Sequence, residues 1–449
     1  MLQPKNAIMK SQFVVGGISP RCGKTLFALG LMEYLKGRKT SVMPFKVGPL
    51  CGDPQLYTLT GEEPAVNLDA WFLRPTELQQ SYNSHGEKAD VCIVEGDKAL
   101  FDGYNCLKGS TADIAKMLGL PVVLVIDAHY QSYSLGAVIY GYKHFRRFSN
   151  VVGVVFNRIV SEGQFAYLRQ ACQDAGVECL GYLPERLEDW GDLPHNGLGR
   201  VDRMEWKKRL EGLAQAIGQH VQVDRLLAQT IRIFPCAYSL PFLSETEQDM
   251  EPVSRVRPRI AIARDACFYA LFNGIIEQWK RKAEVVFFSP LHARELPEAD
   301  YYYLPGGSVE RYAHLIARNR AVLSGLKEKA EAGGCILAEG GAAVLLCAQW
   351  ENRFIGGPLP LYVYAETQLK YGYRQIVSGD SVLRGYESTY LRLKPTIQAG
   401  PTLTCRQVYD LTNTRPDHSL YRYKNVYVST IQWYWERNDF LALWAEGGK

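Results

Sequence analysis

The chain has 449 residues, of which 47% are hydrophobic and 22% charged, and its formal net charge at pH 7 is +4. This length predicts two or three domains, and the balance of charge indicates neither a nucleic-acid partner nor a membrane surface. The eleven cysteines form no CxxC pair and no dense framework, so we expect reduced thiols in a cytoplasmic protein.

Residues 1–235 alternate short apolar runs with amphipathic segments. The first run, 12–17, follows an N-terminal stretch whose apolar part is too short for a signal peptide. Residues 24–37 have the periodicity of a helix, and no stretch of the chain reaches the length of a membrane span. The alternation predicts βαβ units and therefore a parallel sheet covered by helices. Further strands are predicted at 41–47, 91–96, 121–128, 151–157 and 179–184.

The alternation lapses over residues 236–257, which are polar, charged and proline-bearing, and which we interpret as a linker. It restarts in residues 258–449. The segment 360–435 is richer in β-branched and aromatic residues, which indicates an antiparallel extension. We therefore predict two α/β domains, the first with a P-loop-type parallel sheet. Strands of the second domain are predicted at 259–265, 283–291, 300–307 and 334–341.

A glycine-rich turn joins the first predicted strand to the first predicted helix and reads G-I-S-P-R-C-G-K-T over residues 17–25. Backbone N–H groups of such a loop cradle phosphate oxygens, a lysine bridges the β and γ phosphates, and a threonine hydroxyl holds Mg²⁺. The spacing of its glycines resembles the loop of the dethiobiotin synthetase group, which phosphorylates a carboxylate with ATP. The predicted ATP-binding residues are Gly17, Ser19, Arg21, Gly23, Lys24 and Thr25.

Further stretches of the first half resemble a known family in the same order along the chain. They read "PFKVGPLCGDP" (44–54), "NLDAWFL" (67–73), "VEGDKALFDG" (94–103), "TADIAKMLGLPVVLVIDA" (111–128), "GVVFNRI" (153–159) and "GYLPER" (181–186). These segments are similar to those of the cobyrinic acid a,c-diamide synthase family, the glutamine-dependent amidases of corrinoid precursors. The resemblance implies an ATP-binding domain, a corrinoid or related tetrapyrrole substrate, and a homodimer.

The chemistry of such an enzyme can be stated from its residues. A carboxylate is a poor acyl donor, and its phosphorylation makes an acyl phosphate that ammonia can attack. Lys24 and Lys46 are suitable cations, while Thr25, Asp53 and Glu95 are suitable ligands for Mg²⁺, directly or through water. Glu95 ends an apolar strand, at the sheet edge where open α/β folds bind ligands.

Three positions of this half allow more than one interpretation. Asn157 and Pro184 resemble the adenine-binding loops of the family, although Asn157 also fits a strand-end turn. Asp69 fits a structural cap as well as a substrate contact. Leu50 stands where the family has an acid. Either Glu95 and Asp53 then suffice for catalysis, or the substrate carboxylate is handled differently, or ATP is bound without amide synthesis.

The second half resembles the amidotransferase domain of the same family, whose fold is a triad-amidotransferase-like, flavodoxin-like sheet. In a working glutaminase of this class a cysteine at a strand-helix elbow attacks glutamine, a histidine takes its proton, and glycine N–H groups bind the oxyanion. The family's elbow reads A-E-C-G-G, and here it is Ala338-Glu339-Gly340-Gly341. Gly306 and Gly307 can still form the oxyanion hole.

The histidines expected near the C-terminus are also replaced. Gln432 and Tyr434 stand at the two histidine positions, and Tyr386 and Thr389 replace two more. We therefore predict a domain that has lost the family's glutaminase chemistry. The aromatic residues Trp433, Tyr434 and Trp435 can stack on a planar ligand, but packing within the core or at a dimer interface is the favoured interpretation.

Two other cysteines lie near the elbow and are poor substitutes for the missing thiol. Cys335 begins the strand, about five residues or roughly 16 Å of extended chain away. Cys347 is predicted to lie about two turns into a helix that follows the elbow. We interpret both as small buried hydrophobic residues.

Two functions remain open, and a third fits poorly. The first is a MgATP-dependent ligase that activates tetrapyrrole carboxylates and takes ammonia from solution or from a separate glutaminase. The second is a non-catalytic homologue, namely a nucleotide- or tetrapyrrole-binding subunit or an allosteric partner of an active amidase. An unrelated phosphate-loop transport or partitioning ATPase fits poorly, because such proteins lack the second α/β domain.

Overall fold

The computed structural model describes residues 8–50, 52–60, 64–185, 203–235, 257–351, 353–378, 381–396, 403–415, 419–436, 438–439 and 441–445. Within this part of the chain, contacts separate two compact units. The first contains the described residues up to 235, except Leu50 and Gly52, which belong with residues 257–445 in the second. Of the predicted linker, all residues but Arg257 lie outside the described part.

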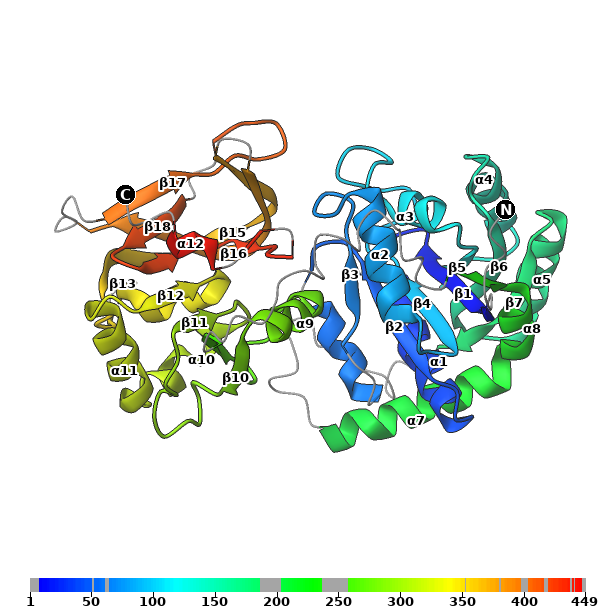
Figure 1. The fold of residues 1–449 in the computed structure, drawn as a ribbon. Helices are drawn as coiled ribbons and strands as arrows, with labels where there is room; N and C mark the ends of the chain where they lie inside the picture. Colours follow the sequence, from blue (N-terminus) through cyan, green and yellow to red (C-terminus); the bar gives the residue numbers. More distant parts are fainter. Residues whose placement is uncertain are drawn as a thin grey trace. The chain divides into compact units, whose positions relative to one another are not determined.

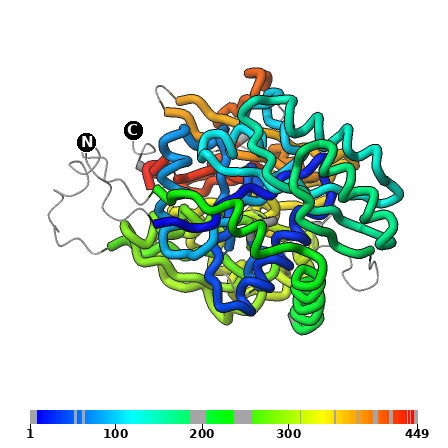
Figure 2. Tube along the Cα trace, turned by 90° about the vertical axis from the view of Figure 1, so that its right-hand side faces the viewer, coloured from blue at the N-terminus to red at the C-terminus, as the bar shows by residue number. Residues whose placement is uncertain are grey.

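The first unit is built on an eight-stranded sheet with the order β3-β2-β4-β1-β5-β6-β7, and β8 pairs with β1 (Figure 1). Neighbouring strands are parallel except β8, which is antiparallel to β1 and runs beside it in Figure 2. The strands are β1 Ile8–Gly17, β2 Val42–Val47, β3 Val66–Leu68, β4 Val91–Glu95, β5 Val122–Asp127, β6 Val151–Ile159, β7 Glu178–Pro184 and β8 Ile231–Phe234.

Helices connect and cover these strands. The intervening elements are α1 Lys24–Gly37, the 3₁₀ helix η1 Asp53–Thr60, α2 Pro75–Gly86, α3 Thr111–Leu118, α4 Leu135–His144, α5 Glu162–Asp174, α7 Arg203–His220 and α8 Val223–Gln229. The predicted α/β class and the six predicted strands are confirmed. Strands β3 and β8 were not predicted, because β3 has only three residues and β8 exposes most of its short run.

The strand order creates a switch point beside β1. The chain leaves β1 toward β2 on one side, and it leaves β4 toward β5 on the other side. Because β1 and β4 are neighbours, their carboxyl ends border a crevice of the type in which open α/β sheets bind ligands. The glycine-rich loop follows β1, and Glu95 is the last residue of β4.

The second unit contains a seven-stranded sheet with the order β10-β9-β11-β12-β19-β18-β17. The strands from β10 to β19 are parallel to their neighbours, whereas β18 and β17 continue the sheet in antiparallel fashion. They are β9 Arg259–Ala263, β10 Glu284–Phe288, β11 Tyr301–Leu304, β12 Cys335–Ala338, β17 Leu403–Gln407, β18 Ser419–Tyr423 and β19 Val426–Val428. The helices are α9 Asn273–Lys282, α10 Val309–Ile316, α11 Arg320–Glu331 and α12 Ala442–Ala445.

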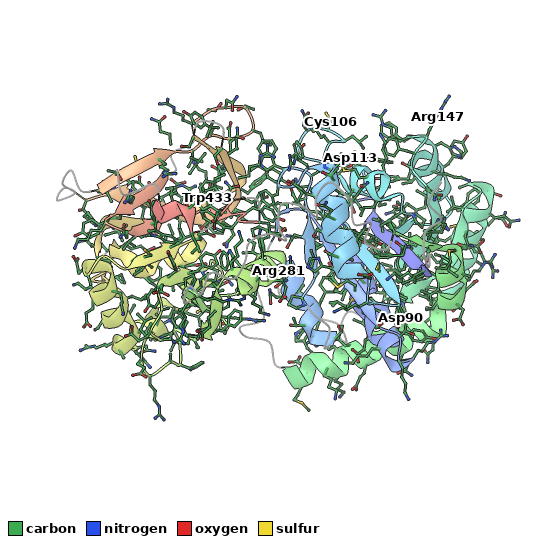
Figure 3. The ribbon with its side chains drawn as sticks, viewed as in Figure 1. Asp90, Cys106, Asp113, Arg147, Arg281 and Trp433 are labelled. Carbon is green, nitrogen blue, oxygen red and sulfur yellow. The ribbon has the colours of Figure 1, made fainter. Side chains whose placement is uncertain are left out.

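A second, five-stranded sheet completes this unit, in the order β14-β13-β15-β16-β20. Its long hairpin β15–β16 supplies the predicted antiparallel extension. The strands are β13 Cys347–Trp350, β14 Arg353–Phe354, β15 Leu359–Ser378, β16 Ser381–Pro395 and β20 Gln432–Trp433. Trp433 of β20 is fully buried, and Figure 3 places it among the C-terminal strands.

The helix predicted after the elbow is wrong. Residues Gly340–Leu346 form the 3₁₀ helix η2, and Cys347 begins strand β13 instead of lying two helical turns further on. The physical reason is burial: Gly341 to Leu346 are all buried, so this apolar run has no solvent-facing side and its periodicity cannot distinguish a helix from a turn that leads into a strand. Within the described part of the chain, no helix is both long and apolar enough to cross a bilayer.

Candidate functional site

The glycine-rich loop folds back tightly on the carboxyl end of β1. A Cβ atom at Gly17 would clash with the Cys22 thiol and lie 3.0 Å from Lys24 Cδ. Gly23 has φ +103°, a left-handed conformation that favours glycine, and a side chain there would collide with Asn157. The two glycines therefore allow the backbone to turn where a phosphate loop needs its N–H groups free of side chains.

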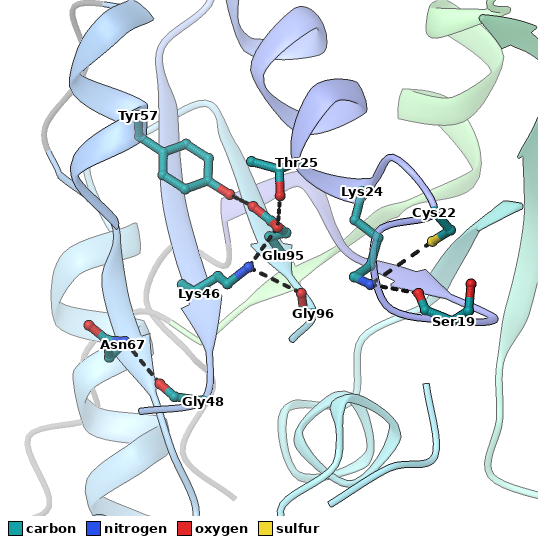
Figure 4. A network of polar contacts seen from close by, with 10 residues as sticks. All are labelled: Ser19, Cys22, Lys24, Thr25, Lys46, Gly48, Tyr57, Asn67, Glu95 and Gly96. Atoms are coloured by element: carbon teal, nitrogen blue, oxygen red, sulfur yellow. Dashed lines mark hydrogen bonds and ion pairs between the residues drawn. The ribbon is translucent and has the colours of Figure 1, made fainter. Parts of the chain in front are cut away.

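Lys24 opens helix α1 with its ammonium group held over the loop. Its Nζ donates to the Ser19 carbonyl at 3.1 Å, and the side chain is buried (Figure 4). Burial lowers the pKa of Lys24, although the nearby Cys22, Glu95 and Asp97 oppose that shift. A cation placed over a glycine loop with little solvation is suited to bind an anion.

Glu95 is the polar centre of this edge of the sheet. Its Oε1 accepts hydrogen bonds from Thr25 Oγ1 at 2.5 Å and from Lys46 Nζ at 2.6 Å, while its Oε2 accepts from the Tyr57 hydroxyl (Figure 4). Lys46 lies directly opposite Glu95 in the β2–β4 ladder, so the sheet register brings the two charges together. Tyr57 comes from the 3₁₀ helix η1, and Thr25 from the first turn of α1.

The charges of this cluster stabilise one another despite deep burial. Lys46 is 3% exposed and Glu95 is 1% exposed. Burial alone would raise the pKa of Glu95, but the ion pair with Lys46 and the hydrogen bonds from Lys46, Thr25 and Tyr57 together lower it below its ordinary value. The carboxylate is therefore ionised at neutral pH.

Asn157 and Asp69 have contacts that bear on their open interpretations. Asn157 Nδ2 donates to the Cys22 carbonyl at 3.2 Å and thereby braces the loop. Its buried Oδ1 has no hydrogen-bond partner within the described structure. Asp69 acts as a cap, because its Oδ1 accepts from the backbone N–H groups of Trp71 at 2.8 Å and Phe72 at 3.0 Å.

The other predicted residues of this half are placed less fully. Arg21 is exposed with φ +59°, and Pro184 is the half-buried last residue of β7. Leu50 is half-buried. The backbone of Asp53 begins η1, but its side chain lies outside the described residues.

Two tyrosines of this half were not anticipated from the sequence. Tyr57 reaches Glu95 from 38 residues away, and Tyr142 donates from α4 to the Ile18 carbonyl of the loop at 2.8 Å. The Tyr142 ring stacks on Phe101 with their centroids 5.3 Å apart. No local sequence pattern indicates a polar role for either residue, because an aromatic residue on an amphipathic segment is normally interpreted as part of the hydrophobic core.

At the elbow of the second unit, strand β12 leads into a sharp turn whose tip is a glycine and therefore carries no side chain. Gly340 follows β12 with φ +55°, the left-handed conformation of a sharp turn. A Cβ atom at this position would lie 3.1 Å from Gly306 Cα and 3.6 Å from Gln432 Oε1. Any side chain here would point at Gly306 and Gln432.

Gln432 places its carboxamide against the predicted oxyanion glycine. Its Oε1 accepts from the Gly306 N–H at 3.2 Å. Its Nε2 donates to the Ala270 carbonyl at 2.7 Å, the Glu339 carboxylate at 3.0 Å and the Tyr303 hydroxyl at 3.1 Å. The structure therefore brings Gly306, Gly340 and Gln432 together, as the sequence predicted.

Gly307 and Tyr434 complete the predicted set. Gly307 has φ +148°, and a side chain there would clash with the Cys267 carbonyl. Tyr434 is buried; its hydroxyl donates to Glu436, and its ring meets that of Phe272 edge-on at 5.0 Å. The burial of Trp433, Tyr434 and Trp435 supports the interpretation that these residues pack within the core.

Glu339 organises this second cluster and was missed as a functional candidate. It is fully buried, and its Oε1 accepts from Trp435 Nε1 at 2.8 Å. Its Oε2 accepts from the Tyr303 hydroxyl at 2.8 Å and from the Trp433 N–H at 3.2 Å. Burial raises the pKa of Glu339 to about 8, against the opposing effect of the bonds from Trp435, Tyr303 and Trp433.

Burial makes the two neighbouring cysteines poor nucleophiles. Cys347 is fully buried, and burial raises its pKa well above the ordinary value. Burial also raises the pKa of Cys335, which lies at the opposite end of β12 from the elbow. A thiol with a raised pKa is a poor source of thiolate at neutral pH.

Comparison with known proteins places this architecture in a family. Residues 11–188 match the model described as an AAA domain, and residues 259–415 match the CobB/CobQ-like glutamine amidotransferase domain. The hydrogenobyrinate a,c-diamide synthase of Brucella abortus is 35% identical over 400 residues, which cover 84% of this chain and 88% of the relative. The chain belongs to the cobyrinate and hydrogenobyrinate a,c-diamide synthase family.

Two further members of the a,c-diamide synthase family come from other bacteria. The cobyrinate a,c-diamide synthase of Streptococcus sanguinis is 33% identical, covering 75% of this chain and 74% of the relative. That of Salmonella typhimurium is 31% identical, covering 89% of each chain. The resemblance stated from the sequence is thus confirmed at the level of the family.

Proposed function

We propose that this chain is a MgATP-dependent amide ligase that activates carboxylates of a corrinoid or related tetrapyrrole as acyl phosphates. One observation carries the proposal: the Glu95 carboxylate, the Thr25 hydroxyl and the Lys46 ammonium converge beside a glycine loop that holds Lys24. Hard oxygen ligands, paired cations and a phosphate loop are the parts that phosphoryl transfer requires. Family membership supports the same activity.

The residues present fit a magnesium ion. Thr25 Oγ1 and Glu95 Oε1 are oxygen ligands 2.5 Å apart, so both can face one hard cation that completes its shell with water and phosphate oxygens. Asp53 is the further ligand expected from the sequence. Bound there, Mg²⁺ would neutralise phosphate charge.

Each charged side chain has a separate task in this proposal. Lys24 binds the β and γ phosphates, and Lys46 both holds Glu95 in its ionised form and stabilises negative charge on the transferred group. The backbone of the loop comes from the region that contains Gly17, Ser19, Arg21 and Gly23. Asn157 and Pro184 border the adenine, and the unpartnered Oδ1 of Asn157 is an acceptor suited to an exocyclic amino group.

The nitrogen is proposed to come as ammonia from solution or from a separate glutaminase. Gly340 offers no thiol, and Gln432 is a poor base because a carboxamide does not titrate in the neutral range. The position that a substrate oxyanion would take against Gly306 is filled by Gln432. The C-terminal unit then serves folding, dimerisation or the covering of a large substrate.

A direct assay tests this proposal. The protein is incubated with MgATP and cobyrinic or hydrogenobyrinic acid, with either ammonium or glutamine as donor, while ADP and product mass are followed. We expect amidation with ammonium alone. Glutamine-driven amidation by the isolated protein would refute the loss of glutaminase activity, and absence of amidation with both donors would refute the ligase.

Leu50 favours a second candidate, a non-catalytic nucleotide- or tetrapyrrole-binding subunit or allosteric partner. A leucine at the family's acid position can neither ligate a metal nor orient a nucleophile. This alternative predicts ATP or tetrapyrrole binding by calorimetry without ADP release. A gain of turnover in Leu50→Asp, over a parent chain that binds ATP without releasing ADP, would support this alternative; ADP release and amidation by the parent chain itself would contradict it.

We further propose that the protein is cytoplasmic and forms a homodimer. The location follows from the scattered cysteines without a disulfide framework, and the dimer follows from the family resemblance. Light scattering coupled to size-exclusion chromatography tests the oligomer. A mass of one chain at micromolar concentration would contradict the dimer.

A further inference from the structure

We propose that the glutaminase-like pocket is a carboxamide-binding site that the chain fills with its own Gln432. The inference rests on the loss of glutaminase chemistry proposed above and goes one step further. It says that the pocket still recognises a primary amide, and that the amide is now supplied by the protein.

First, the hydrogen-bonding groups of the pocket match those of a primary amide. A primary carboxamide has one acceptor oxygen and two N–H donors. The Gly306 N–H can only donate, and it faces Oε1 at 3.2 Å. The Ala270 carbonyl can only accept, and it faces Nε2 at 2.7 Å. These two backbone groups fix the orientation of the amide, because exchanging its oxygen and nitrogen would break both contacts.

The second step is the position of the amide. Gln432 Oε1 lies 2.5 Å from where a Cβ atom at Gly306 would stand, and 3.6 Å from where one at Gly340 would stand. The carboxamide therefore lies beside the tip of the elbow, against the glycine N–H that would bind an oxyanion. This is the place at which a nucleophile on the elbow would meet an amide substrate.

The third step is the attachment of Gln432. The residue is 8% exposed, and the three donors Gln432 Nε2, Trp433 N–H and Trp435 Nε1 all bind the single buried carboxyl of Glu339. Glu339 itself precedes Gly340 in the elbow. Glu339 thus attaches the Gln432 side chain to the turn. Because this side chain fills the pocket, free glutamine is excluded from it.

Removal of the occupant should expose the site to small amides. In Gln432→Ala the melting temperature is measured with and without propionamide, a small primary carboxamide that has one carbon atom more than the group removed. We expect a lowered Tm that propionamide raises by about 1–2 °C at ten times its Kd. The wild-type Tm should not respond, and neither protein should respond to sodium propionate, which lacks the N–H donors.

Two control variants test whether a response to propionamide is specific to the loss of the Gln432 amide. Gln432→Met fills the volume without the amide, so its Tm should fall and stay insensitive to propionamide. Gln12→Ala removes a buried glutamine of the first unit, whose amide donates to the Arg232 carbonyl and accepts from the Tyr82 hydroxyl. A propionamide response of either variant as large as that of Gln432→Ala would overturn the proposal, as would no response of Gln432→Ala.

If Gln432→Ala accumulates only as aggregates, refolding with and without propionamide gives the same comparison. Recovery with the amide supports the site, and equal recovery without it contradicts the site. The outcomes stay separate from those of the ligase assay. Glutamine hydrolysis by the wild-type chain would refute the loss of glutaminase function, whereas an unresponsive Gln432→Ala would refute only the occupancy by Gln432.

Discussion

A buried carboxyl group stands beside each of the two glycine turns of this protein, Glu95 near the phosphate loop and Glu339 at the elbow. Glu95 faces the ammonium of Lys46, and its pKa is lowered. Glu339 accepts hydrogen bonds only from neutral donors in its described contacts, and its pKa is raised to about 8. Equal burial thus leads to opposite shifts of the pKa, because one carboxyl has a cation beside it and the other has only dipoles.

This contrast separates a site that can do charged chemistry from one that serves packing. An ionised carboxylate with adjacent cations can organise a metal ion and phosphates. A carboxyl with a raised pKa and only neutral donors around it can hold tryptophan and amide N–H groups in place, but no cation beside it stabilises its charged form.

The largest effect is expected when the buried Glu95 loses its neighbouring cation, as Glu339 has none in its described contacts. Lys46→Met leaves Glu95 buried without its cation, which should lower the free energy of unfolding by about 3–5 kcal/mol at pH 8. The loss should shrink toward pH 5, because Glu95 then takes up a proton. Urea unfolding at both pH values measures it, with the exposed Lys208→Met as control. A loss of equal size at both pH values would contradict this electrostatic origin.

Removal of the loop cation should affect turnover more than stability. In Lys24→Ala we expect ATP-dependent turnover to fall by about 10²–10³-fold, because transferred charge is no longer neutralised. ADP release measures the effect, and Lys208→Ala, on the exposed face of α7, serves as the control. Turnover within threefold of wild type would show that the loop does not bind the reacting phosphates, since that factor is only about 0.65 kcal/mol.

The raised pKa of Glu339 predicts a pH dependence of stability with a definite sign. The folded chain holds the Glu339 proton up to pH about 8, whereas an unfolded glutamate releases it near 4.5. The stabilisation is therefore complete below pH 4.5 and is lost as pH rises toward 8, at up to about 1.4 kcal/mol per pH unit.

Glu339→Gln should flatten this decline. Unfolding in urea at pH 5, 6, 7, 8 and 9 compares the slopes of wild type and variant. Glu277→Gln, which changes an exposed glutamate of α9, is the matched control and should keep the wild-type slope. Parallel slopes for wild type and Glu339→Gln would refute the assignment.

The smallest effect is expected at Tyr57. Tyr57→Phe removes one of the hydrogen bonds to Glu95 and should reduce ATP-dependent turnover by about five- to tenfold, the equivalent of one typical net hydrogen bond of about 1 kcal/mol. The pH profile of turnover should shift its acidic limb upward, because Glu95 becomes less acidic. An unchanged profile together with reduced turnover would assign Tyr57 a packing role only.

Local features of the sequence allowed much of the first site to be predicted. Continuous apolar runs mark strands buried on both faces, and Gly17, Gly23, Lys24 and Thr25 mark a phosphate loop because their chemistry acts within a few residues. Glu95 could be chosen because it ends such a run. Tyr57 could not be chosen, because its contact with Glu95 spans 38 residues and depends on how η1 packs.

The second site was predicted by comparison of motifs and less by local chemistry. Gly340 and Gln432 were identified from the sequence as replaced positions. The contact between Gln432 and Gly306, however, joins residues that are 126 positions apart in the chain. The roles of Glu339 and Tyr303 went unrecognised, because a glutamate in a turn and a tyrosine in a strand carry no signal of burial. The helix predicted after the elbow is wrong for a different reason, because Gly341 to Leu346 are all buried and the run therefore has no informative periodicity.

By itself, the sequence determined six strands of the first unit and four of the second, the phosphate loop and the absence of a thiol at residue 340, since these depend on residue type and spacing along the chain. Only the tertiary structure decided the charge of the two buried carboxyls and the occupant of the elbow pocket. The protonation of a buried group depends on which charges and dipoles surround it in space, and here those partners come from distant strands and turns.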